Sequence, residues 1–372
     1  MTKRDITILV KPVSGMCNMR CAYCFYADEM KKREKALCGI MNKDICDALI
    51  SKALEYVGGG HISFVFQGGE PLLAGIEFFK YFIQQVKCKN IENAVVDYSV
   101  QTNGTLIDET WAAFFKENAF LLGLSMDGYN EIHDRYRRDN KGQPTHASVE
   151  RAAEILERYE VPYNIVTVVT KDIAKKITSV YSYYRKKGYT YQQYIPCLDA
   201  LLEEPGKEEW SLTSDVYGTF LIKLFDLWYK DRREGKFIYI PYFENLAGML
   251  LGEFTGSCGM TGTCMYQNVV ESDGRIYPCD FYVLDEYCIG SVADSSFEEA
   301  DVKRRAFILE SEGGLEECRL CPYEYICHGG CRRHRQGVSQ LEKNFFCQSY
   351  KKFFFYAVPK LENLLRENRN VR

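Results

Sequence analysis

Sixteen cysteines, gathered mainly in two places, are the feature that most limits what this chain can be. Three follow one another closely at Cys17, Cys21 and Cys24, and eight lie between Cys258 and Cys331. A secreted disulfide scaffold is normally much shorter than 372 residues. Clustered cysteines in a reducing compartment more often bind metal. We therefore expect metal centres rather than disulfides.

The net charge and the lengths of the apolar runs argue against two classes of protein, nucleic-acid binders and membrane proteins. The formal net charge is −4 and no half of the chain is a basic block, so we expect no nucleic-acid partner. The sequence contains no run of eighteen apolar residues, so we expect no membrane span. The apolar run that ends at Lys11-Pro12 is too short for the core of a signal peptide. We expect a cytoplasmic protein, and a monomer.

The first 200 residues alternate strand-like runs with helical patterns, which predicts parallel strands with right-handed crossovers. An open doubly wound sheet and a partial barrel both satisfy this pattern, and in both the functional end is the carboxyl end of the strands. The expected strands are Ile6–Val10, Ile62–Phe66, Val95–Gln101, Leu121–Met126, Tyr163–Val169 and Tyr191–Ile195.

The pattern changes near residue 235. A long helix is expected from about Thr213 to Arg233, and after it glycines and cysteines become frequent. Residues 269–277 predict a hairpin with Asp273-Gly274 at its turn. We predict two domains, 1–235 and 236–372, the second ending in a packing helix over 353–365. Asp108 is the expected N-cap of a helix in the first domain.

The first cysteine group has the spacing C-x3-C-x2-C, directly after the first expected strand. A tetrahedral zinc site needs four ligands, and no fourth cysteine or histidine lies nearby. Three thiolates suit a cubane iron–sulfur cluster with one iron left open, because each cubane iron normally takes one cysteine. A zinc knuckle completed by a distant residue is the alternative.

Polar segments follow three expected strands, and their convergence predicts one binding mouth. They are Gln67-Gly68-Gly69-Glu70-Pro71, Gln101-Thr102-Asn103-Gly104 and Ser125-Met126-Asp127-Gly128. The two glycines allow the backbone to approach a ligand closely, and Glu70 could receive an ammonium group. Gln67 and Asn103 could hold a peptide backbone.

The second cysteine group contains enough thiolates for two complete four-ligand sites. These sites could hold two further iron–sulfur clusters or two structural zinc ions. We favour iron–sulfur clusters, because the open cluster of the first group must receive electrons. The ligands available are Cys258, Cys264, Cys279, Cys318, Cys321, Cys327, Cys331 and Cys347.

The C-x3-C-x2-C motif followed by Gly68-Gly69-Glu70 resembles the radical S-adenosylmethionine superfamily. The resemblance implies a partial (β/α)6 TIM-like barrel of the α/β class and an open iron that binds S-adenosylmethionine. Transfer of one electron would cleave the sulfonium of that cofactor and give a 5′-deoxyadenosyl radical. The contacts to S-adenosylmethionine that the resemblance implies are Tyr23, Gly69, Ser125, Arg137 and Leu198.

The cysteine-rich half resembles the SPASM extension of radical enzymes that modify peptides. The resemblance implies two auxiliary [4Fe–4S] clusters, and three clusters in all. It assigns the first auxiliary cluster to Cys258, Cys264, Cys279 and Cys331, and the second to Cys318, Cys321, Cys327 and Cys347. Clusters with four cysteines each suit electron transfer, and a purely structural role is the alternative.

Taken together, these motifs and Tyr277-Pro278-Cys279-Asp280 are similar to the anaerobic sulfatase-maturating enzymes. The resemblance implies oxidation of a cysteine or serine in a sulfatase Cys/Ser-x-Pro/Ala-x-Arg sequence to Cα-formylglycine. Asp280 matches the family's catalytic base. An unfolded or nascent sulfatase would be the substrate, and a flavodoxin or ferredoxin the electron donor. Two alternatives are a thioether or carbon–carbon crosslinking maturase with the same domains, and a zinc-stabilised binding module.

Overall fold

The computed structural model describes residues 3–201, 203–312, 316–335 and 343–369. The chain forms two compact units that alternate along the sequence. The first contains residues 1–125, 134–163 and 266–307, and the second contains residues 126–133, 164–265 and 308–372. The boundary at residue 235 concerns the family modules and stays a prediction.

The first unit is built on a mixed sheet in which the strand order is β4-β3-β2-β1-β7-β8-β9. Strands β1 to β4 are parallel, β7 is parallel to β1, and β8 and β9 complete the edge in antiparallel fashion. The bounds are β1 Asp5–Val10, β2 His61–Phe66, β3 Val95–Thr102, β4 Leu121–Ser125, β7 Asn268–Val270, β8 Arg275–Tyr277 and β9 Gly290–Ser291.

Parallel register brings three strand ends to one level at the centre of this sheet. Val10 lies opposite Phe66 of β2 on one side and opposite Val270 of β7 on the other. The residues that follow these strands, Lys11, Gln67 and Glu271, therefore leave the sheet side by side.

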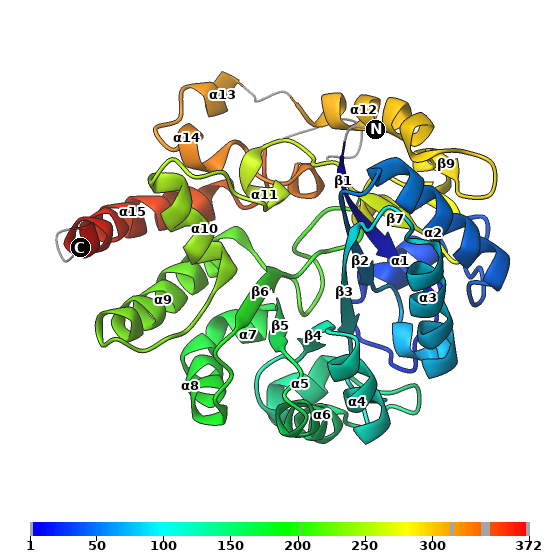
Figure 1. The fold of residues 1–372 in the computed structure, drawn as a ribbon. Helices are drawn as coiled ribbons and strands as arrows, with labels where there is room; N and C mark the ends of the chain where they lie inside the picture. Colours follow the sequence, from blue (N-terminus) through cyan, green and yellow to red (C-terminus); the bar gives the residue numbers. More distant parts are fainter. Residues whose placement is uncertain (1–2, 202, 313–315, 336–342, 370–372) are drawn as a thin grey trace. The chain divides into compact units, whose positions relative to one another are not determined.

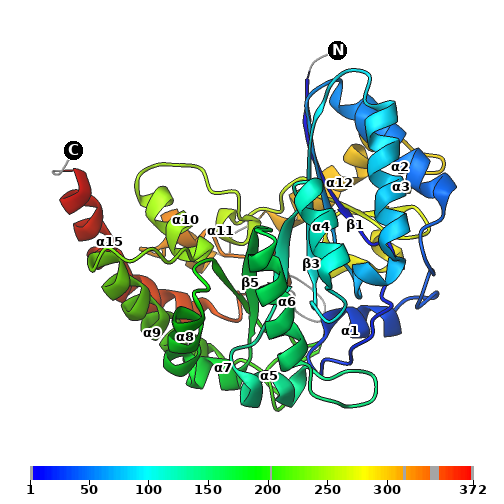
Figure 2. The same cartoon turned by 60° about the horizontal axis from the view of Figure 1, so that its bottom comes forward.

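Helices of the first unit cover the sheet, with α2 and α3 side by side (Figures 1 and 2). Their aromatic rings pack against the strands: the Phe64 ring meets the Phe82 ring edge to face, and Phe66 packs on Phe79. The elements are α1 Phe25–Lys31, α2 Lys43–Val57, η1 Pro71–Ala74, α3 Ile76–Lys89, α4 Glu109–Glu117, α6 His146–Arg158, η2 Asp280–Tyr282 and η3 Asp285–Tyr287. Helices α5 (Asn130–Tyr136) and α12 (Phe297–Ser311) contribute residues to both units.

The second unit contains the parallel pair β5 (Tyr163–Val169) and β6 (Gln192–Pro196). Its long helices α9 and α15 lie side by side (Figure 1) and bury an aromatic core in which Phe225 and Phe353 pack on Phe243. The helices are α7 Lys171–Lys175, α8 Ile177–Lys187, α9 Ser214–Arg233, α10 Pro241–Leu250, α11 Cys258–Thr261, α13 Glu316–Arg319, α14 Glu324–Cys327, η4 Arg332–His334 and α15 Cys347–Arg369.

The six expected strands, the 269–277 hairpin and the helix from Thr213 are confirmed, most to within a residue. Asp108 caps α4, since its side chain accepts a hydrogen bond from the Trp111 N–H at 2.9 Å. The expected terminal helix over 353–365 was too short, because α15 already begins at Cys347. No helix in the described part of the chain combines the length and apolar character of a membrane span.

Candidate active site and cluster-binding loops

The loop that carries Cys17, Cys21 and Cys24 runs from β1 to α1, and the Gly-Gly-Glu segment after β2 is bonded to it. Gly69 N–H donates to the Ser14 carbonyl at 3.0 Å, and Glu70 N–H donates to the Met16 carbonyl at 2.8 Å. A Cβ atom on Gly69 would lie 1.9 Å from the Met16 oxygen. The glycine is therefore required for close packing of the two loops.

Glu70 joins this loop to the end of β3. Its fully buried carboxylate accepts hydrogen bonds from the Thr102 hydroxyl at 2.7 Å, the Asn103 N–H at 2.7 Å and the Leu72 N–H at 3.1 Å. Burial raises the pKa of Glu70 to about 7, against the opposing effect of these donors. The expectation that Glu70 could receive an ammonium group gains no support, because this carboxylate is engaged by three donors of its own chain.

Asn103 links the strand end to the first cysteine. Its side-chain N–H donates to the Asn18 side chain at 2.9 Å and to Cys17 Sγ at 3.8 Å. Met19 N–H also donates to Cys17 Sγ, at 3.4 Å. Donors to a cluster sulfur stabilise the thiolate and tune the cluster, so these contacts fit a ligand cysteine.

Two of the residues predicted to bind S-adenosylmethionine flank the second cysteine. The Arg137 guanidinium lies 4.0 Å from Cys21 Sγ and 5.5 Å from the centre of the Tyr23 ring, and both side chains are buried. Ser125 ends β4 and accepts a hydrogen bond from Gln101 at 3.0 Å. Leu198 follows β6 and belongs to the second unit.

The three thiols fit a three-cysteine cluster. All three are partly exposed and lie in one loop. A negative charge on Cys24 contributes to raising the pKa of Cys17. Burial, opposed by the hydrogen bond from Met19, raises the pKa of Cys17 to about 11. Binding of iron displaces the proton of a ligand thiol, so cluster assembly would hold Cys17 as the thiolate.

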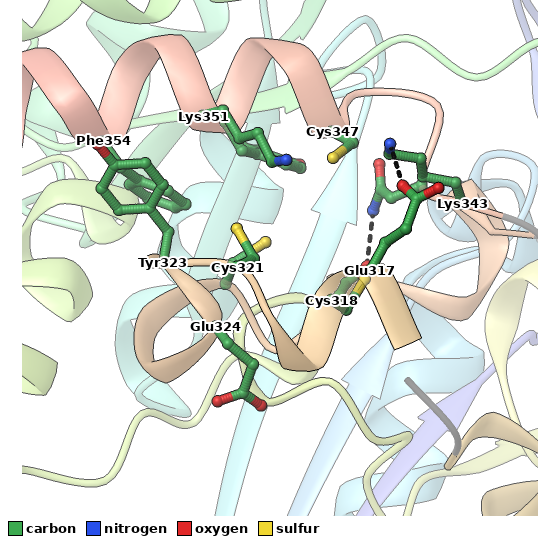
Figure 3. Close-up of a pocket in the computed structure, with 13 residues that line it drawn as sticks. Glu317, Cys318, Cys321, Tyr323, Glu324, Lys343, Cys347, Lys351 and Phe354 are labelled. Atoms are coloured by element: carbon green, nitrogen blue, oxygen red, sulfur yellow. Dashed lines mark hydrogen bonds and ion pairs between the residues drawn. The ribbon is translucent and has the colours of Figure 1, made fainter. Parts of the chain in front are cut away.

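The predicted ligands of the second auxiliary cluster line a single pocket in the second unit (Figure 3). Cys318 and Cys321 flank the end of α13, Cys327 ends α14, and Cys347 begins α15. Burial raises the pKa of Cys327 to about 11, and charges on the other three thiols add to the shift. At the pocket, Lys343 pairs with Glu317 at 2.6 Å.

Three predicted ligands of the first auxiliary cluster also lie together. Burial raises the pKa of Cys331 to about 11, and the charges of Cys258 and Cys264 contribute. The fourth, Cys279, belongs to the first unit. Among the described residues, no three His, Cys, Asp or Glu side chains are arranged to hold a single metal ion.

Asp280 lies next to Cys279, and three side chains of the first unit hold its carboxylate. Lys11 Nζ lies 3.0 Å from Oδ1. The Tyr26 hydroxyl and the Gln67 amide donate to Oδ2 at 2.5 and 2.7 Å. The hairpin of β7 and β8 thus returns Asp280 to the ends of β1 and β2, where a base beside the cysteine loop is chemically useful.

The chain matches two family models in the order predicted. Residues 12–174 match the radical SAM superfamily, and residues 258–322 match an iron–sulfur cluster-binding domain called SPASM. A cysteine-type anaerobic sulfatase-maturating enzyme of Clostridium perfringens (strain 13 / Type A) is 46% identical over 96% of this chain and 98% of its own length. This chain belongs to the anaerobic sulfatase-maturating enzymes.

Other members of the family support the assignment. A serine-type anaerobic sulfatase-maturating enzyme of Bacteroides thetaiotaomicron is 27% identical over 99% of this chain and 93% of its own length. The solved structure of anSMEcpe with bound AdoMet and the Cp18Cys peptide is 45% identical. It superposes with a TM-score of 0.93 over 99% of this chain and 100% of that one.

The fold class and cofactors of this maturating enzyme follow from the family. It is a radical SAM α/β protein with a SPASM domain, and it uses S-adenosylmethionine and three [4Fe–4S] clusters. The zinc-stabilised binding module considered from the sequence is therefore the wrong class.

Sequence reasoning missed two of the residues around Asp280. Lys11 was considered only as the end of an apolar run, and nothing in the sequence linked Tyr26 to Asp280. A lysine directly after a buried strand, at the working end of the sheet, was the available signal. The Gln67 amide donates to Asp280, and the expectation that Gln67 holds a peptide backbone stays a prediction.

Proposed function

We propose that this enzyme is a cysteine-type maturase that oxidises the cysteine of a sulfatase Cys-x-Pro/Ala-x-Arg sequence to Cα-formylglycine. The observation that carries the proposal is the much higher similarity to cysteine-type than to serine-type relatives, over nearly the whole chain. The substrate would be an unfolded or nascent sulfatase polypeptide, because the target must enter the site as an extended peptide.

We propose Asp280 as the base of this reaction. When bound, the cofactors supply the 5′-deoxyadenosyl radical that takes a hydrogen atom from the cysteine Cβ, and an iron–sulfur acceptor for the remaining electron. Asp280 takes the thiol proton. Loss of one hydrogen atom, one proton and one electron gives a thioaldehyde, and water then replaces the sulfur and releases hydrogen sulfide.

Cofactor contacts are proposed for Tyr23, Gly69, Ser125, Arg137 and Leu198. Of these five contacts, the one proposed for Arg137 has the most support, because its buried guanidinium beside Cys21 is a suitable donor to the carboxylate of S-adenosylmethionine. Gly69 would present its backbone to the ligand, as its packing on Met16 leaves no room for a side chain.

All eleven predicted cysteine ligands are retained in the proposal. A flavodoxin or ferredoxin as electron donor, a monomeric state and a cytoplasmic location stay predictions. So does electron transfer, rather than a structural role, for the auxiliary clusters.

Product mass spectrometry tests the proposal. Two sulfatase-motif peptides that differ only in cysteine or serine at the target position are incubated anaerobically with reduced enzyme and S-adenosylmethionine. We expect formylglycine from the cysteine peptide, and at least tenfold slower conversion of the serine peptide. Equal rates would contradict the cysteine-type assignment. A crosslinked peptide in place of formylglycine would favour the crosslinking maturase.

Asp280→Asn, assayed beside the wild type, tests the base. The variant keeps the size of the side chain and removes the basic carboxylate, so we expect product formation to fall about 100-fold or more. Cluster absorption serves as the control for intact protein. Product formation at the wild-type rate would remove Asp280 from this role.

A further inference from the structure

Lys11 is a buried cation whose position is set by the sheet. It is the first residue after β1, its N–H donates to the Val270 carbonyl of β7 at 2.8 Å, and its side chain is 2% exposed. Its ammonium nitrogen lies 3.0 Å from Asp280 Oδ1 and 3.9 Å from the centre of the Tyr26 ring. Both the ion pair and the contact with the ring face favour a charged lysine at this point.

The surrounding charges explain why a cation is stable there. Burial alone would lower the pKa of Lys11. The negative charges of Asp280, Glu29 and Glu271 have a larger, opposite effect, so that the pKa of Lys11 is raised. Glu271 has a cation of its own, because Arg33 lies 2.8 Å from it in a second buried ion pair. Asp280 is in direct ion-pair contact with Lys11.

The two carboxylate oxygens of Asp280 have different partners. Oδ2 accepts from both Tyr26 and Gln67, which uses both of its lone pairs. Oδ1 faces Lys11, and among the described residues it has no hydrogen-bond partner besides this ion pair. Oδ1 is itself buried, so its ion pair with Lys11 is the contact that holds this side of the carboxylate in place.

We infer that Lys11 is a positioning residue that holds the Asp280 carboxylate in the orientation in which it receives the substrate proton. The inference rests on the proposed function, in which Asp280 is the base. In the step concerned, the S–H bond of the substrate breaks and its proton passes to the Asp280 carboxylate. The hydrogen atom from Cβ has gone to the deoxyadenosyl radical and the electron to an iron–sulfur cluster, so atoms and charge balance.

Lys11→Met tests this, because methionine keeps the length and apolar shaft of the side chain without its charge. The readouts are kcat, KM for the cysteine peptide, and the ratio of 5′-deoxyadenosine released to formylglycine formed. We expect kcat to fall about 10- to 100-fold with little change in KM, since a small misplacement of a reacting group has this effect. The ratio should rise, because hydrogen abstraction continues while proton transfer fails.

Arg33→Met is the matched control. It removes the neighbouring buried cation, which pairs with Glu271 and not with Asp280. Loss of folded or cluster-loaded protein lowers both products equally, so we expect this variant to keep the wild-type ratio. A wild-type ratio in Lys11→Met, or an equally raised ratio in both variants, would overturn the inference.

If Lys11→Met loses its clusters, Lys11→Arg provides a second test of the inference in the same assay. Arginine keeps the positive charge, so we expect more formylglycine per deoxyadenosine than with methionine. Equal ratios in the two variants would contradict positioning by charge.

Asp280→Asn in the same assay separates the two claims. A wild-type ratio in Asp280→Asn would refute the base itself. A raised ratio in Asp280→Asn with a wild-type ratio in Lys11→Met would refute only the role of Lys11.

Discussion

At Gly69 the backbone passes so close to the cysteine loop that no side chain fits. The loops are joined by two backbone hydrogen bonds, from Gly69 to Ser14 and from Glu70 to Met16. The distance of 1.9 Å between an added Cβ and the Met16 oxygen can only be relieved by moving one of the two backbones. The position of Cys17 therefore depends on a residue that lies 52 positions away in the sequence.

We expect Gly69→Ala to displace the cysteine loop. Iron content should fall by about one cluster of the three, and cleavage of S-adenosylmethionine should be lost, because the first cluster is bound by this loop. Iron analysis and 5′-deoxyadenosine release measure both effects. Gly256→Ala is the control, since an added Cβ there meets nothing within 4 Å. Full iron content and normal cleavage in Gly69→Ala would show that the loops adapt.

Single residues differ in how far the sequence could predict them. The cysteine ligands were predictable because their chemistry depends on short, local spacings. The Tyr26–Asp280 contact joins residues 254 positions apart, and the sequence offers no local pattern for it. The donors to Glu70 were not predictable either, because the Gly-Gly-Glu spacing indicates a loop but not which groups the carboxylate contacts.

At the scale of elements, the hairpin of β7 and β8 explains how Asp280 reaches the first strands. β7 pairs in parallel with β1, and β8 pairs back onto β7 through the Asp273-Gly274 turn. Gly274 has φ of +90°, a conformation that favours glycine. The strands and this turn were predictable from local patterns.

Other elements were less predictable. Helices α11, α13 and α14 contain four residues each, too few to show a helical period. The start of α15 at Cys347 was missed because the apolar face that identifies the helix becomes clear only from Phe353 onward.

Capping of α4 gives a prediction for one element. The Asp108 side chain accepts the Trp111 N–H, and it satisfies one of the donors that a helix start leaves unpaired. We expect Asp108→Ala to lower the free energy of unfolding by about 1 kcal/mol. Thermal unfolding of cluster-loaded enzyme measures it, and Asp108→Asn, which can still cap, is the control. An unchanged melting temperature in Asp108→Ala would argue against the cap.

At the scale of the whole molecule, the proposal assigns three groups of thiols and one base to this chain. The first group lies in a single loop, whereas the predicted ligands of the second auxiliary cluster line one pocket beside α13, α14 and α15. Residues 266–307 belong to the first compact unit because β7 pairs with β1. The boundary at residue 235 concerns the family modules and stays a prediction. The central claim is that the first group supplies three thiolates to a cluster of four irons.

The most direct measurement of that claim is the electron paramagnetic resonance spectrum of reduced enzyme with and without S-adenosylmethionine. If Cys17, Cys21 and Cys24 leave one iron open to this ligand, its addition changes the signal of one cluster, and the change is absent in Cys21→Ala. A spectrum of the wild type that does not respond to S-adenosylmethionine would contradict the account.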